Sequence, residues 1–108
     1  MRSFLLVMTN CTPGKEAEFN TWYQEVHLKE VLEVPGFVAA QRFELGDAQI
    51  SEDARPHRFL AIYEVEGDPK AAFDRLQASS EEMNMSETLD LESTFTAHYT
   101  PIGERREA

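Results

Sequence analysis

Short apolar runs alternate with longer mixed segments along the 108-residue chain. Four of these runs have the length and the aromatic or β-branched content of β-strands. They cover residues 2–10, 36–45, 57–66 and 91–100. In the first and third runs, apolar side chains occupy both alternating faces, which predicts strands covered by protein on both sides.

The first helix is predicted between the first two strands. Thr12 is a suitable N-cap, and Pro13 suits the first helical position because no hydrogen bond from its nitrogen is needed there. Pro35 follows the apolar periodicity, so we expect this helix to end near Glu33.

The second half of the chain repeats this order. Residues 67–69 have the same helix-start chemistry, and a helix is predicted from there to about Ser79. Ser79 and Glu82 have the spacing of a capping box, which favours a short helical piece over residues 80–88. The polar segment 46–56 is predicted to be a loop.

The predicted order is βαββαβ, an α+β arrangement of the ferredoxin-like type. It forms a four-stranded antiparallel sheet with both helices on one face. The other face would leave many apolar side chains uncovered, which favours a two-fold homodimer with the two sheets face to face. Residues 1–103 are expected to form a single domain, and residues 104–108 a charged C-terminal tail.

Composition narrows the classes of function. Hydrophobic residues make up 42% of the chain, as in globular proteins, and the net charge is -10. Such an acidic surface repels phosphate backbones and anionic lipids, so neither nucleic acid nor membrane is an expected partner. No apolar run approaches the roughly 20 residues of a membrane span. The single cysteine excludes an internal disulfide framework and favours a cytoplasmic location.

Candidate chemistry gathers on the first predicted helix. At 100° per residue, one stripe that should face the sheet holds Phe19, Trp22, Tyr23 and Val26. His27 lies at the edge of this stripe, and Glu30 lies near its centre one turn later. In an acid–base site, His27 would exchange a proton, Glu30 would orient it, and Tyr23 would donate to a developing oxyanion. The alternative is an ordinary aromatic core with a solvated histidine at its rim.

Residues 21–37 resemble the W-Y-x-x-x-H-x-x-x-x-L-x-x-P-G-F signature of EthD-like proteins, in the dimeric α/β-barrel superfamily. The resemblance extends to residues 97–102. It implies a two-fold dimer with a pocket between the helices and the sheet of each subunit. Relatives include aromatic polyketide cyclases, cofactor-free monooxygenases, muconolactone isomerases and haem-degrading enzymes. In the cyclases, pocket histidines and a first-helix tyrosine do acid–base chemistry, and Tyr23 and His27 match these positions.

Further candidates lie outside this motif. His57, at the start of the third strand, is either a second pocket acid or base or an exposed loop residue. His98 lies on the fourth strand, and the sequence leaves open whether it faces the helices or the dimer barrel. Trp22, Phe59 and Met83 complete the expected substrate contacts.

Metal and haem sites find little support in the sequence. The three histidines follow no metal-ligand spacing, so no metal is expected. The haem-binding relatives have a second-helix histidine that residues 68–90 lack.

These observations predict a small enzyme without a cofactor. Its substrate would be a hydrophobic or aromatic molecule with a carbonyl group, and its reaction a cyclisation, dehydration, isomerisation or lyase-type cleavage. Two alternatives stay open. One is a non-catalytic protein that binds a ligand for a partner enzyme, and the other is a cofactor-free monooxygenase.

Overall fold

The four predicted strands form one antiparallel sheet in a computed structural model that describes residues 1–108. They are β1 (Arg2–Thr9), β2 (Phe37–Glu44), β3 (Phe59–Glu66) and β4 (Phe95–Tyr99). Their order across the sheet is β2-β3-β1-β4. The pairing of β2 with β3 shifts register between Phe37 and Ala39, which leaves Val38 without a partner. The fold is therefore the predicted ferredoxin-like arrangement.

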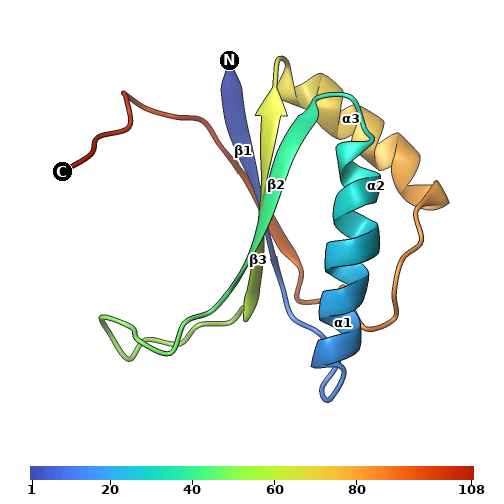
Figure 1. Ribbon diagram of the computed structural model, residues 1–108, viewed down its shortest axis with the longest axis vertical. Coiled ribbons are helices and arrows are strands. Elements are labelled where there is room, and N and C mark those ends of the chain that lie inside the picture. Colours follow the sequence, from blue (N-terminus) through green and yellow to red (C-terminus); the bar gives the residue numbers. More distant parts are fainter.

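All helices lie on one side of this sheet (Figure 1). The first is a continuous rod made of α1 (Glu16–Trp22), a π-helical turn η1 (Tyr23–His27) and α2 (Leu28–Leu32). The second is α3 (Pro69–Ser79), followed by a 3-10 turn, η2 (Ser80–Glu82). No helix is both long enough and apolar enough to cross a membrane.

The hydrophobic core lies between the rod and the sheet. Phe19 is fully enclosed and packs against Tyr23 and Phe59, with ring centroids 5.7 and 5.1 Å away. Twelve buried apolar residues form this core: Leu5, Phe19, Tyr23, Leu28, Val31, Val34, Phe37, Phe59, Ala61, Tyr63, Val65 and Ala72.

The first helix differs from the prediction at both its start and its buried stripe. It begins at Glu16, because the Thr12 hydroxyl donates to the Glu87 carbonyl (3.1 Å) instead of capping the helix. The stripe continues through buried Leu28 rather than through Val26. In a regular α-helix Phe19 and Val31 would be about 120° apart, whereas one extra residue absorbed by the π turn reduces this to about 20°.

The second half follows the prediction only in part. The helix α3 begins as expected, with the Asp68 side chain accepting from the Lys70 amide (3.1 Å). The capping box is wrong: Ser79 makes no cap, and the chain becomes extended after η2. The fourth strand starts at Phe95 instead of Leu91, because Asp90 holds the preceding residues in a turn.

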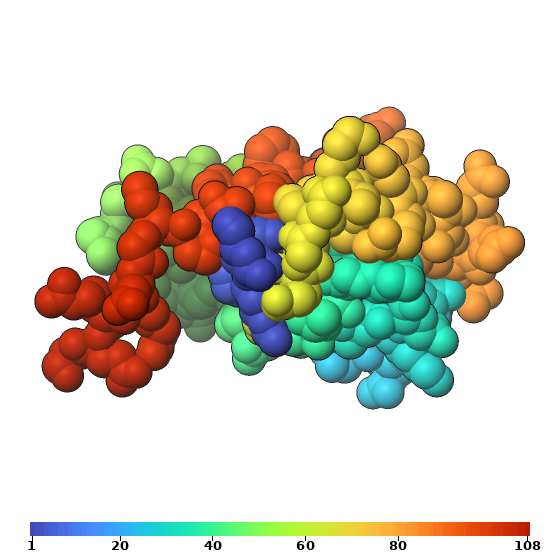
Figure 2. All heavy atoms as spheres, turned by 90° about the horizontal axis from the view of Figure 1, so that it is seen from above, coloured from blue at the N-terminus to red at the C-terminus, as the bar shows by residue number.

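The second face of the sheet is uncovered and apolar. Its side chains come from all four strands and are partly or largely exposed: Phe4, Leu6, Met8, Phe43, Leu60, Ile62, Phe95 and Tyr99. We call this set the open face. The loop between β2 and β3 and the C-terminal residues 100–108 extend on this side, away from the helices (Figures 1 and 2).

Candidate functional site

A cavity of about 210 Å³ lies between the helical rod and the sheet. Its volume falls between that of a cavity that binds benzene, about 150 Å³, and the roughly 300 Å³ or more of drug-sized sites. The lining is largely apolar and comes from the rod, β1, β3, β4, α3 and the segment after η2. It consists of Leu5, Val7, Tyr23, His27, Val31, Tyr63, Leu76, Ser80, Met83, Met85 and Thr96.

The π turn brings His27 onto Trp22. The two rings are stacked, with centroids 4.9 Å apart and planes 20° apart. In a regular α-helix, residues five apart point about 140° away from each other, so this stack depends on the π turn. Tyr23 meets the same imidazole edge-on, with centroids 5.0 Å apart. Single π turns of this kind occur frequently at functional sites.

His27 and Glu30 face each other without a hydrogen bond. Nδ1 of His27 and Oε1 of Glu30 are 3.9 Å apart, and both atoms are enclosed without a partner. A movement of about 1 Å would bring them into hydrogen-bond distance. The His27 ring lines the cavity, and with Nδ1 facing Glu30, Nε2 is the ring nitrogen left for a ligand.

Burial lowers the pKa of His27, and the Glu30 carboxylate only partly opposes this effect. The imidazole is therefore neutral at physiological pH. A neutral imidazole has one nitrogen able to accept a proton, which is the form required of a general base.

Asn84, in the extended segment after η2, fixes the other side of this cluster. Its backbone N–H and its Nδ2 both donate to Oε2 of Glu30, at 2.8 and 3.1 Å. Its main-chain carbonyl accepts from Nε1 of Trp22 at 2.6 Å. One residue therefore holds two of the three groups that contact the His27 ring, Trp22 and Glu30.

Two tyrosine hydroxyls meet at the cavity wall. The Tyr63 hydroxyl donates to the Tyr23 hydroxyl at 3.1 Å, so the proton of Tyr23 is left for another acceptor. Burial raises the pKa of both tyrosines, which keeps them protonated at neutral pH. The Arg42 guanidinium lies 4.6 Å from the centroid of the Tyr23 ring and opposes this rise for Tyr23. Tyr23 is thus a hydrogen-bond donor with a cation over its ring.

The structure brings five of the eight expected site residues together. Tyr23, His27 and Met83 line the cavity. Trp22 and Glu30 do not line it, but both lie against the His27 imidazole.

The remaining three candidates lie elsewhere. Phe59 belongs to the core, and His98 faces the helices, where it meets the Phe73 ring edge-on at 5.1 Å. This settles the open question of the fourth strand: Thr96 and His98 face the helices, and Phe95 and Tyr99 lie on the open face.

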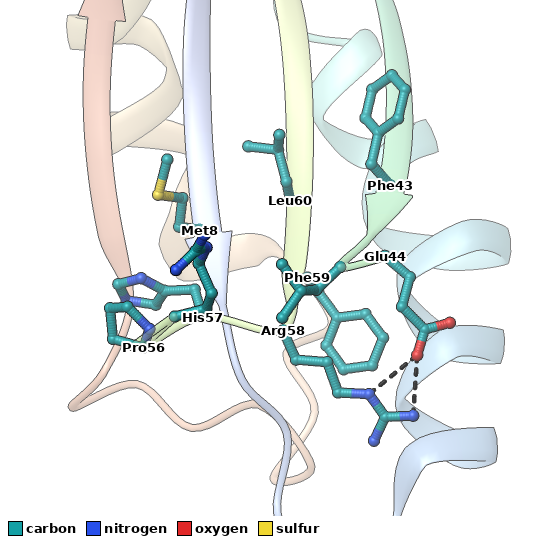
Figure 3. A pocket seen from close by; sticks show the side chains of 10 residues that line it. Met8, Phe43, Glu44, Pro56, His57, Arg58, Phe59 and Leu60 are labelled. Atoms are coloured by element: carbon teal, nitrogen blue, oxygen red, sulfur yellow. Dashed lines mark hydrogen bonds and ion pairs between the residues drawn. The ribbon is translucent and has the colours of Figure 1, made fainter. Parts of the chain in front are cut away.

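His57 lies at a second concavity, of about 300 Å³, at the end of the open face (Figure 3). Met8, Phe43 and Leu60 form its apolar floor. A ring nitrogen of His57 is 2.7 Å from the Ser93 carbonyl, so this side chain ties the loop to the start of β4. The sheet separates it from His27.

The described side chains include no cluster of three or more His, Cys, Asp or Glu that could hold a metal ion. The residues that the sequence did not single out are Tyr63, Asn84 and Arg42. Tyr63 carried a usable signal, because it alternates with Ala61 and Val65 on the buried face of a strand. Asn84 carried none, since its contacts cross more than 50 residues of sequence.

Comparison with known proteins places the fold. The sequence matches no protein-family model and no curated protein. An EthD-like protein from Ralstonia eutropha JMP134 is 10% identical, with a TM-score of 0.64, and the match covers 96% of this chain and 95% of that one. A dimeric ferredoxin-like protein of unknown function from Jannaschia sp. CCS1 is 11% identical, with a TM-score of 0.61, covering 94% and 100%.

The haem degrader MhuD from Mycobacterium tuberculosis, solved with two haems in its active site, is 13% identical, with a TM-score of 0.64, covering 96% and 99%. At these identities the likeness establishes the fold alone. The chain has the ferredoxin-like fold of EthD-like proteins, as its sequence predicted. The helix α3 contains no histidine, so the second-helix position that the resemblance assigns to a haem ligand is not filled by one.

Proposed function

We propose that this protein is an enzyme that moves protons at a carbon next to a carbonyl group, without a bound cofactor. The substrate is a compact hydrophobic or aromatic molecule. The observation that carries the proposal is the pairing of two enclosed, unpartnered atoms, Nδ1 of His27 and Oε1 of Glu30, beside an apolar cavity. Buried polar atoms without partners are costly, and a facing pair of them beside an apolar cavity is the arrangement expected of an acid–base site.

His27 is the general base in this proposal. Its Nε2 takes the proton, the C–H electron pair moves toward the carbonyl, and the carbonyl oxygen becomes an enolate. The imidazolium that results gains a charge partner in Glu30 as the 3.9 Å gap closes. Returning the proton to a different carbon of the substrate gives isomerisation, and passing it to a β-hydroxyl group that leaves as water gives dehydration. In a cyclisation, the enolate carbon forms a bond to a second carbonyl carbon of the same molecule, and the alkoxide that results takes the proton.

Tyr23 stabilises the enolate oxygen. Its free proton is available for this oxygen because Tyr63 already donates to its hydroxyl. The Arg42 guanidinium over the Tyr23 ring favours the partial negative charge that the phenol takes on. An apolar wall strengthens these interactions by excluding water.

The test is proton exchange in D₂O. One-ring aromatic ketones and small 1,3-diketones are incubated with the protein, and loss of their α-proton signals is followed by NMR. His27→Gln should lower the enzyme-dependent rate by about 10²–10⁴-fold. His57→Gln is the matched control, because His57 lies on the other side of the sheet, and it should keep the full rate.

An equal rate in the wild type and in His27→Gln would refute the mechanism. Ligands that bind to the wild type without any exchange would favour the non-catalytic, ligand-carrying alternative.

We also propose that the protein works as a homodimer that buries the open face. Eight large apolar side chains on one flat face are unusual for a monomer. The Jannaschia protein of the same fold is described as dimeric, which supports this. Leu60→Glu should halve the mass measured by sedimentation. Leu32→Glu is the control on the outer surface of the helices and should leave the mass unchanged.

A further inference from the structure

We propose that Asn84 is a positioning residue that aims the Glu30 carboxylate at His27 and thereby decides which nitrogen of the imidazole carries the proton. The inference rests on the proposed function for its purpose. Its geometry and its test concern only the ligand-free protein.

The two donors of Asn84 bind only one of the two carboxylate oxygens of Glu30. Both of its donors bind Oε2 of Glu30, at 2.8 and 3.1 Å, and neither binds Oε1. With Oε2 occupied, Oε1 is directed to the enclosed side, 3.9 Å from Nδ1 of His27. A carboxylate acceptor on that side favours the proton on Nδ1, and this leaves Nε2 unprotonated toward the cavity.

The Glu30 side chain has an alternative orientation, toward solvent, when Asn84 does not bind it. It also lines an open groove of about 300 Å³ between α2 and the end of α3, together with Glu33 and Glu82. Its side chain is 16% exposed, so a rotation toward this groove would return the carboxylate to water. Hydration in the groove competes with the enclosed position, and the two Asn84 bonds decide between them.

Asn84 holds the second neighbour of the imidazole as well. Its main-chain carbonyl accepts from the Trp22 indole at 2.6 Å, and this indole is the ring stacked on His27. The imidazole is thus confined by Trp22 on its face and by Glu30 at Nδ1, and both are tied to one residue.

Few other ionisable groups act on His27. The rod contributes Glu30 and Tyr23, and β3 contributes Tyr63. From η2 and the segment that follows, the cavity-lining residues are Ser80, Met83 and Met85, none of which ionises. Glu30 is the only carboxylate within ion-pair distance, so changes in the His27 titration report mainly on Glu30.

The experiment is a double-mutant cycle read by NMR on ¹⁵N-histidine-labelled protein. Glu30→Gln removes the charge and should lower the pKa of His27 by about 1 or more. Asn84→Ala removes the Nδ2 bond to Glu30 and keeps the main-chain N–H bond, so it should shift the pKa in the same direction by a smaller amount. It should also reduce the fraction of the tautomer with the proton on Nδ1. In the Glu30→Gln background, Asn84→Ala should change neither quantity, because it acts through Glu30.

Asn10→Ala is the matched control. Asn10 also makes several hydrogen bonds, to Pro56, Ser93 and Arg58, but these lie away from the cavity. This variant should leave the His27 titration and tautomer unchanged. If Asn84→Ala does not fold, Asn84→Ser replaces it, since its shorter side chain keeps a hydroxyl but loses the reach of the amide.

A folded Asn84 variant with an unaltered His27 titration and tautomer would overturn the proposal. So would an effect of Asn84→Ala that persists when Glu30 is glutamine. Because no substrate is used, an absence of proton exchange in the activity test would defeat the proposed function and leave this inference standing.

Discussion

The hydrogen bond between the two buried tyrosines allows a sharp stability prediction. Tyr63 is 1% exposed and Tyr23 is 2% exposed, and the two hydroxyls are each other's partners at 3.1 Å. Tyr23→Phe leaves the Tyr63 O–H without an acceptor, and Tyr63→Phe leaves the Tyr23 oxygen without a donor. Each single variant should lower the free energy of unfolding by about 1–3 kcal/mol, since it leaves a buried polar group unpaired.

The double variant removes both polar groups at once. Its loss of unfolding free energy should therefore be smaller than the sum of the two single losses, by about 0.5–1.5 kcal/mol. Urea denaturation measures this through the fluorescence of the single tryptophan, Trp22, at one fixed protein concentration. Tyr99→Phe is the control. Because Tyr99 is 59% exposed, this change should have the same small effect on stability in the wild type and in Tyr23→Phe. Additive losses for Tyr23→Phe and Tyr63→Phe would refute the bond.

Three further predictions test other parts of the structure. Because burial lowers the pKa of His27, the unfolded chain takes up its proton first, and the wild type should lose stability as pH falls below about 6.5. Relative to His27→Gln, this loss of unfolding free energy should reach about 1.4 kcal/mol for each unit by which the pKa of His27 differs between the folded and the unfolded chain. Urea titrations that find the same difference in stability between the two proteins at pH 7 and at pH 5 would contradict this. Gly36→Ala should cost more than about 1 kcal/mol in thermal unfolding, because Gly36 has a φ of 107° and an added Cβ would lie 2.8 Å from that of Ala72. Gly14→Ala, with a φ of 81° but open space around it, should cost less, and equal costs would argue against the contact. Asp68→Ala should lower the stability by about 1 kcal/mol by removing the helix cap, and an unchanged melting temperature would argue against that role.

The sequence was sufficient for the fold because the relevant signals are local. Apolar runs and helix-start chemistry such as Asp68-Pro69 identify the elements, and the element order leaves few arrangements of the sheet. The ends of elements were less predictable because tertiary bonds decide them. Thr12 has a cap's side chain, yet its hydroxyl binds a carbonyl 75 residues away.

The candidate site was predictable only where it follows the first helix. Tyr23, His27 and Glu30 share a face at helical spacing, although the π turn, which no periodicity rule anticipates, sets their contacts. Asn84 reaches the site from a distant segment, and no pattern in a single sequence connects it to the site. The alternation in its strand marks Tyr63 as buried, but not as the hydrogen-bond partner of Tyr23. His57 lies away from the predicted pocket, at the second concavity, where its ring also ties the loop to the residues before β4.

The register shift at Val38 has a consequence for how these molecules meet at high concentration. β2 and β4 are the two outer strands, and outer strands offer free amides and carbonyls to neighbouring chains. The bulge interrupts that ladder on β2, and β4 presents only five residues. Growth of fibres through strand-to-strand addition is therefore disfavoured at both edges of the sheet, and the open face is the surface left for the proposed dimer.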